Sequence, residues 1–195
     1  MIGPYCSFEH SLGLIPLLHM ESDEHHDPFQ DSSGRASLTL KLGDAPYGPE
    51  AGHVGVLNSL ARSGLPMPGG VVLMEESHRR FLKSSGLAWD LLASGGETEV
   101  QGRALELRRR YRGCALEEVL RGVIRNALAE IGGRTVAVIS KDVTCMGLHS
   151  IPRVEEAVLR AWISTNGLKR QVEATIQGGE IPLWPVLIQR ELHEG

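Results

Sequence analysis

The sequence predicts a mixed fold of helices and strands, of the α+β class. Apolar residues alternate with polar ones over residues 38–42, which is typical of a half-buried strand. Residues 71–74 and 135–139 are short apolar runs that fit buried strands. Residues 116–131 keep an unbroken apolar stripe at spacings of three and four, which predicts an amphipathic helix. At 195 residues and 42% hydrophobic content, the chain is long enough for about one such domain.

The front of the chain is expected to divide into a tail and the start of that domain. Residues 1–35 have no sustained period of 2 or 3.6, so they are predicted to be a disordered tail before a single domain at 36–195. After a Gly- and Pro-rich turn, apolar residues at helical spacing predict a helix that ends at Gly64. Acidic residues near the N-terminal end favour a further helix over residues 75–83, directly after the strand at 71–74.

The remaining elements follow the same alternation. Residues 94–102, rich in Gly and Ser, are expected to form a connecting loop. Residues 154–164 have the periodicity of another amphipathic helix. Residues 183–192 are predicted to form a strand, in which Pro185 indicates either a sheet edge or the start of the strand.

Composition excludes several classes of function. The formal charge of −4 and the pI of about 6.1 give no electrostatic signature of nucleic-acid or membrane-surface binding. The three cysteines, Cys6, Cys114 and Cys145, are far apart and suit a reduced setting rather than a disulfide or thiolate metal framework. The N-terminus lacks the basic region and long apolar run of a signal peptide or membrane span, so we expect a cytoplasmic protein.

Several stretches in a fixed order resemble a known family. Within residues 52–82 they are Gly64-Leu65-Pro66, Pro68, Gly70, Val71-Val72 and Arg79-Arg80-Phe81, and later ones are 136–138, 154–164 and 186–189. This order is similar to the GGKGANL turn, GLPVPPGFVV segment, VAVRSS strand, WAS-like helix end and VLVQ strand in the N-terminal nucleotide-binding domain of the phosphoenolpyruvate synthase and pyruvate phosphate dikinase family. The resemblance covers about 53–192 with gaps.

The resemblance implies the front portion of an ATP-grasp-like domain, which binds ATP with Mg2+ and transfers a phosphoryl group. The positions that match its phosphate-binding segments are Gly52 and His53 in the glycine-rich turn, and Ser140 and Lys141 after the VAV strand. These four are the predicted nucleotide-binding residues. No catalytic residue and no metal ligand is assigned.

The same alignment departs from the family where charge is needed. His53 stands in place of the turn's lysine, and Ile139 in place of the arginine of VAVRSS. Isoleucine carries no charge, and losing such a cation typically slows phosphoryl transfer about a thousandfold or more. Lys141 could substitute, but it lies two residues along the strand, about 7 Å out of register. Residues 142–153 are shorter than the family's lid, and the sequence ends before the family's second, Mg2+-binding lobe.

Three hypotheses follow. The first is a diverged member of the family that binds ATP weakly, or only with a partner that supplies the missing half, and is not catalytically competent alone. The second is a non-catalytic interaction module that pairs with another protein, or with its own copies, through the surface the second lobe would cover. The third is a gene remnant without a role.

Other reactive residue types favour ordinary roles. The cluster Glu24-His25-His26-Asp27 has metal-ligand types but no second group to close a site. Arg108-Arg109-Arg110-Tyr111-Arg112 could contact phosphates or RNA, although neighbouring glutamates favour a solvated helix face. The remaining candidates, expected to be ordinary loop, surface or core residues, are His53, His78, His149, Cys114, Cys145 and Trp162.

Overall fold

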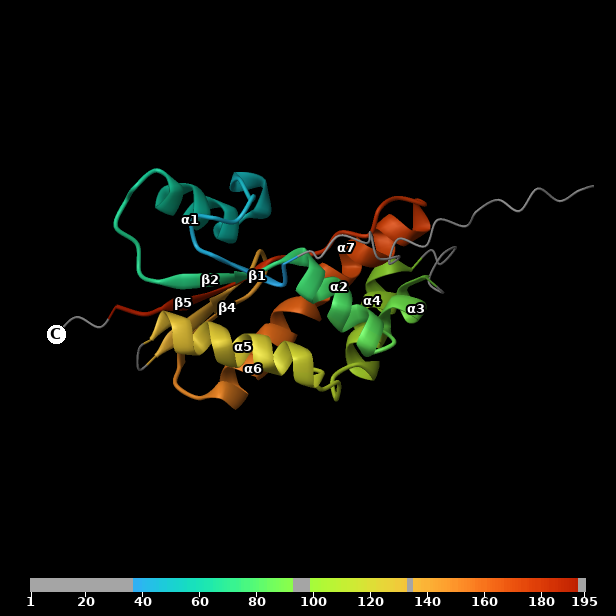
Figure 1. Cartoon of the computed structure of the whole chain (residues 1–195). Coiled ribbons are helices and arrows are strands. Elements are labelled where there is room, and N and C mark those ends of the chain that lie inside the picture. Colours follow the sequence, from blue (N-terminus) through green and yellow to red (C-terminus); the bar gives the residue numbers. More distant parts are fainter. Residues whose placement is uncertain (1–36, 93–98, 133–134, 193–195) are drawn as a thin grey trace, which may run out of the picture.

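The computed structural model describes residues 37–92, 99–132 and 135–192. Five strands and the helices around them make up this part of the chain (Figure 1). The strands are β1 (Thr39–Lys41), β2 (Gly70–Leu73), β3 (Val136–Ile139), β4 (Thr144–Leu148) and β5 (Val186–Arg190). The helices are η1 (Pro49–Ala51), α1 (His53–Arg62), α2 (Glu75–Ser84), α3 (Leu87–Leu92), α4 (Val100–Arg110), α5 (Glu118–Ile131), α6 (Ile151–Trp162) and α7 (Thr165–Ile176). The mixed α and β class is thereby confirmed.

The strands form one sheet in the order β1-β2-β5-β3-β4, and every neighbouring pair is antiparallel. The strand β5 therefore lies at the centre, where Ile188 is opposite both Val71 of β2 and Val138 of β3. Pro185 precedes β5 and marks its start, as one of the two sequence interpretations held. The other interpretation, a sheet edge, is wrong because β5 lies between β2 and β3. The central place is possible because Pro185 lies just outside the strand and removes no hydrogen bond from the ladder.

The larger core lies between the sheet and the helices that include α2, α5 and α6 (Figure 1). It receives alternate strand residues, such as Val71 and Leu73 of β2, since successive side chains of a strand point to opposite faces. Trp162 of α6 is completely buried there, as the sequence predicts, and stacks with the rings of His78 and Phe81 of α2 at centroid distances of 5.4 and 5.5 Å. The predicted apolar stripe of α5 packs into the same core.

The opposite face of the sheet is covered by α1 (Figure 1). Its smaller core contains Val54 of α1 and the strand residues Val72 and Leu187, all completely buried. Ile139 packs at the margin of this core. The side chain that stands where the family's arginine would be thus has an apolar packing role.

The predicted elements agree with the structure within a few residues, but several other elements were missed. The strand β4 and the helices η1, α3 and α7 were not expected, and of α4 only the C-terminal end was interpreted as helical. Residues 94–98 of the predicted connecting loop lie outside the described residues, but residues 100–102 belong to α4, so the loop prediction is wrong there. Gly102 favoured the loop prediction because glycine is a poor helix former. Tertiary packing outweighs this weak local preference, so Gly102 lies within α4.

The predicted tail at residues 1–35, and with it the Glu24–Asp27 cluster for which no metal site was assigned, lies outside the described residues. None of the helices among those described combines the length and the apolar character that a bilayer span requires.

Candidate functional site

Two of the predicted nucleotide-binding segments, about 90 residues apart in the chain, meet in the structure. Gly52 precedes α1, and Lys141 follows β3. A Cβ atom placed on Gly52 would lie 3.3 Å from Cγ of Lys141 and 3.5 Å from its Cα. Gly52 also has a φ of +67°, which side-chain-bearing residues rarely adopt. Glycine is therefore required here both by the backbone and by the close approach of the lysine.

The turn that presents Gly52 is held against α1 by one buried amide. Asn58, completely buried, accepts a hydrogen bond from the Gly43 N–H at 2.8 Å. Its amide nitrogen donates to the carbonyl oxygens of Ala45 and Tyr47 at 2.8 and 2.9 Å. Both amide hydrogens of Asn58 and its carbonyl oxygen are thus hydrogen-bonded to this turn. These bonds fix the shape of the loop before α1.

The N-terminal end of α1 has no side-chain cap within the described part of the chain, and Gly52 at the cap position carries no side chain. The first N–H groups of a helix have no partner within the helix and give this end a partial positive charge, which attracts anions. His53, exposed at the first helical position, stands beside this end.

Lys141 adds a full positive charge next to the same end. Lys41 and Lys169 pair with glutamates, whereas Lys141 forms no ion pair with any described residue. Its Nζ lies 4.8 Å from the centre of the Trp184 ring. A cation–π contact of this kind orients an ammonium group without neutralising it.

The other cation at Trp184 is already compensated. The Arg170 guanidinium carbon also lies 4.8 Å from the ring centre, but its Nη2 forms an ion pair with Asp142. Asp142 in turn accepts a hydrogen bond from the Ser164 hydroxyl at 3.3 Å. Trp184 therefore holds two cations, and only Lys141 remains free for a ligand.

Ser140 is used differently from the prediction's expectation of a ligand contact. It is almost completely buried, its hydroxyl donates to the Val143 carbonyl oxygen at 3.1 Å, and it accepts from the Val143 N–H at 3.0 Å. The hydroxyl thus closes the turn from β3 to β4. Ser140 fixes the position of Lys141, which leaves Gly52, His53 and Lys141 as the predicted residues that could contact a ligand directly.

The short segment after Lys141 forms a strand. Residues 144–148 make up β4, which pairs with β3 at the edge of the sheet. No group of three or more His, Cys, Asp or Glu side chains that could hold a metal ion comes together in the described ranges. Asp142, the carboxylate next to Lys141, is already engaged with Arg170. The uncapped end of α1 and the charge of Lys141 therefore suit an anionic group.

Sequence reasoning missed Asn58, Trp184 and Arg170. A signal existed for Asn58, because it lies four residues after Val54 on the buried face of α1, where a polar residue needs a partner. Trp184 and Arg170 lie on a loop and on an unpredicted helix, and only the fold brings them to Lys141.

The other residues considered for chemistry do not assemble. His78 is buried beneath Trp184, and its Nδ1 accepts the Trp184 backbone N–H at 2.9 Å. His149 contacts only the Gly147 carbonyl oxygen, at 3.2 Å. Cys114 and Cys145 are free thiols in the described structure, and burial raises the pKa of the Cys114 thiol. No nucleophile and base are thus paired among these residues.

Comparison of the sequence with models of known protein families finds no match, and a search of curated proteins finds none either.

Proposed function

We propose that this chain is a nucleotide-binding lobe that takes the phosphate groups of ATP at the N-terminal end of α1. The proposal includes the finer description of the fold, the front portion of an ATP-grasp-like domain similar to that of the phosphoenolpyruvate synthase and pyruvate phosphate dikinase family. Gly52, His53 and Lys141 contact the phosphates, and Ser140 holds Lys141 in place.

The observation that carries the proposal is the packing of Lys141 against Gly52. These residues were selected from separate segments by resemblance alone, and unrelated surface residues 90 positions apart seldom touch. Their meeting point combines an uncapped helix N-terminus, a glycine without a side chain and an ammonium group without a carboxylate partner. Phosphate-binding sites use the same three ingredients.

The same arrangement argues against phosphoryl transfer by this lobe alone. Transfer needs metal ions and cationic side chains around the transferred group. Ile139 occupies one cationic position with an apolar side chain, and His53 replaces the lysine of the turn with a shorter side chain. Binding without turnover is therefore the expected behaviour, unless a partner supplies the missing charges and metal.

Replacing Lys141 with alanine should weaken ATP binding about tenfold, because one charge-assisted contact to phosphate is lost. Replacing His53 with lysine should strengthen binding by a similar factor, because it restores a full charge at the first turn of α1. Isothermal titration calorimetry of the full chain with millimolar ATP, with and without Mg2+, measures both changes.

Lys169→Ala is the matched control, since Lys169 is a lysine already paired with Glu173 on α7. It should leave ATP binding unchanged. The proposal is wrong if millimolar ATP produces no heat and no thermal shift. It is also wrong if Lys141→Ala binds ATP as tightly as the parent and the Lys169→Ala control do.

The interaction module remains a second candidate because α1 carries apolar side chains on its outer surface. Val56 and Leu60 are 44% and 37% exposed, and Leu65 just beyond the helix is 51% exposed. Residues four apart lie on one face of a helix, so Val56 and Leu60 form a continuous apolar strip. Such a strip suits a second copy of the chain or another protein.

If this strip is an interface between copies, light scattering coupled to size exclusion should find a dimer whose population falls in Leu60→Glu. Val119→Glu changes a similarly exposed residue on α5 and should leave the dimer intact. A chain that stays monomeric at about 0.5 mM would count against self-association, because a specific homodimer has a lower dissociation constant.

A further inference from the structure

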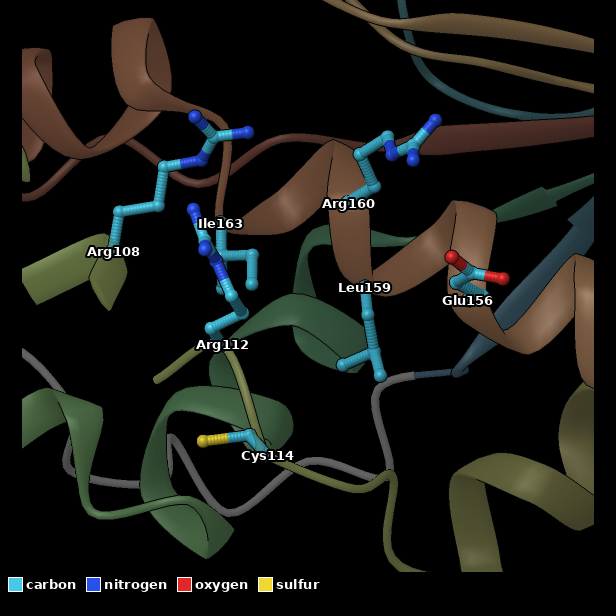
Figure 2. A pocket seen from close by; sticks show the side chains of 7 residues that line it. All are labelled: Arg108, Arg112, Cys114, Glu156, Leu159, Arg160 and Ile163. Atoms are coloured by element: carbon cyan, nitrogen blue, oxygen red, sulfur yellow. The ribbon is translucent and has the colours of Figure 1, made fainter. Parts of the chain in front are cut away.

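A second site lies away from Lys141, in a pocket between the C-terminal end of α4 and the last turns of α6. Its volume is about 360 Å3. Figure 2 shows Arg108 of α4 and Arg112, just beyond that helix, with guanidinium groups that turn toward the same region, while Leu159 and Ile163 come from α6 and its end. Pockets of this size hold small organic molecules rather than a nucleic-acid strand.

The charges of this pocket are not compensated by the protein. Eight arginines of the described chain pair with carboxylates: Arg79, Arg80, Arg103, Arg110, Arg121, Arg125, Arg153 and Arg170. Arg108, Arg112 and Arg160, which all line the pocket, form no ion pair with any described residue. The single carboxylate of the lining, Glu156, contacts Arg153 outside it.

Unpaired guanidinium groups that share one hollow favour an anion. Arg108 is only partly exposed, which reduces the screening of its charge by water. Two like charges at one site repel each other, and an anion between them removes this repulsion. Guanidinium forks match the oxygen spacing of phosphate and can donate two hydrogen bonds each.

The lining also contains two apolar side chains and one unreactive thiol. Leu159 and Ile163 are partly buried and pack against the main core, so they offer a fixed wall for carbon atoms. Cys114 lies at the same pocket, as Figure 2 shows, but burial and the charge of Asp90 raise the pKa of its thiol. A protonated thiol is a poor nucleophile, so the pocket is equipped to bind rather than to react.

We propose that this pocket binds a small phosphate monoester, whose phosphate is held by Arg108 and Arg112 and whose carbon body lies against Leu159 and Ile163. Arg160, on the α6 side, adds to the positive potential. The monoester is either a soluble metabolite or the exposed head group of a lipid such as phosphatidic acid. The site is independent of the nucleotide proposed at α1.

Titration of the full chain with phenyl phosphate tests the site, because this probe joins a dianion to an apolar ring. Phenyl phosphate should bind more tightly than inorganic phosphate, and the uncharged benzyl alcohol should not bind. Arg108→Gln and Arg112→Gln should each weaken phenyl phosphate about tenfold, since each removes a charge-assisted pair of hydrogen bonds. Both should keep the parent's thermal stability, since neither arginine has a partner to lose.

Arg109→Gln is the matched control, because Arg109 carries the same charge on the same helix and does not line the pocket. It should change the affinity less than about twofold, through long-range charge alone. The proposal would be overturned if Arg109→Gln and Arg108→Gln weakened phenyl phosphate binding equally, or if phenyl phosphate did not bind at all. Tighter binding of a short RNA than of phenyl phosphate, through the same arginines, would also overturn it. Lys141→Ala should leave phenyl phosphate binding intact, so that failure at either site is seen separately.

Vesicles of phosphatidylcholine with and without phosphatidic acid distinguish the two sources of the monoester. Sedimentation with the phosphatidic acid vesicles, lost in Arg108→Gln and retained in Arg109→Gln, would assign the site to a lipid head group. Binding of phenyl phosphate without sedimentation would assign it to a soluble monoester.

Discussion

Replacing Gly55 with alanine will destabilise the fold by about 3 kcal/mol or more, the upper range for overpacking in a dense interior. Gly55 is buried in the first turn of α1, where a Cβ atom would overlap the carbonyl oxygen of Gly48. The neighbour is backbone, and Asn58 holds the same loop through three hydrogen bonds, so the loop cannot move away cheaply. Urea unfolding followed by circular dichroism measures the change.

Gly122→Ala is the control and should have the opposite sign. Gly122 lies within α5, and the nearest atom to an added Cβ is a flexible guanidinium nitrogen of Arg125 at 4.0 Å. Alanine there should stabilise the fold by about 0.5–1 kcal/mol, because it lowers the backbone entropy of the unfolded chain. Equal effects of the two substitutions would show that α1 does not pack on its loop as described.

Acidification should destabilise this protein through His78 in particular. The ring is completely buried against Trp162, and burial, followed by the charge of Arg79, lowers the pKa of His78 from 6.5 to about 3. Between these values the unfolded chain binds one proton more than the folded chain. The histidine's contribution is therefore fully present above pH 6.5 and decreases by about 1.4 kcal/mol per pH unit as the pH falls toward 3.

The structure also explains why the ring resists protonation. Its Nδ1 accepts the Trp184 N–H at 2.9 Å, so a proton on Nδ1 would destroy this hydrogen bond. The neutral ring consequently carries its hydrogen on Nε2, which has no hydrogen-bond partner in the described part of the chain. A protonated His78 ring would lose its hydration on burial, and no new hydrogen bond would compensate for this loss.

His78→Asn separates the titration from the packing. The asparagine oxygen can accept the same N–H, but it does not titrate, and the stack on Trp162 is lost. This variant should be less stable than the parent at pH 7, with a shallower loss of unfolding free energy between pH 6 and pH 4. His149→Asn, which makes the same substitution at an exposed site, is the matched control. Parallel curves for parent and His78→Asn would contradict the assignment.

The parts of the fold that could be predicted from sequence are those with repeated local signals. The stripe of α5 has four turns of consistent apolar spacing, and β2, β3 and β5 are apolar on both faces because helices cover both. In contrast, β4 has exposed or half-exposed residues throughout, so it lacks the alternation that identifies a strand. Its pairing with β3, rather than its own composition, makes it a strand.

The candidate site was predictable only in part for a similar reason. Gly52 and Lys141 could be identified from motif positions, and their meeting depends on α1 lying across the end of β3. Ser140 looked like a phosphate-side hydroxyl, yet its bonds to Val143 are local ones that a serine in a tight turn commonly makes. Trp184 has no neighbouring sequence signal, because its role depends on Lys141 and Arg170 from distant segments.

The place of β5 constrains the order in which the sheet can be assembled during translation. β5 comes after the other four strands of this sheet in sequence, yet it joins β2 to β3. Until about residue 190 has left the ribosome, both neighbours expose unpaired N–H and C=O groups, which invite pairing with other chains. Closure of this sheet during translation therefore has to wait for β5, and a nascent chain stalled before Val186 should be a chaperone substrate.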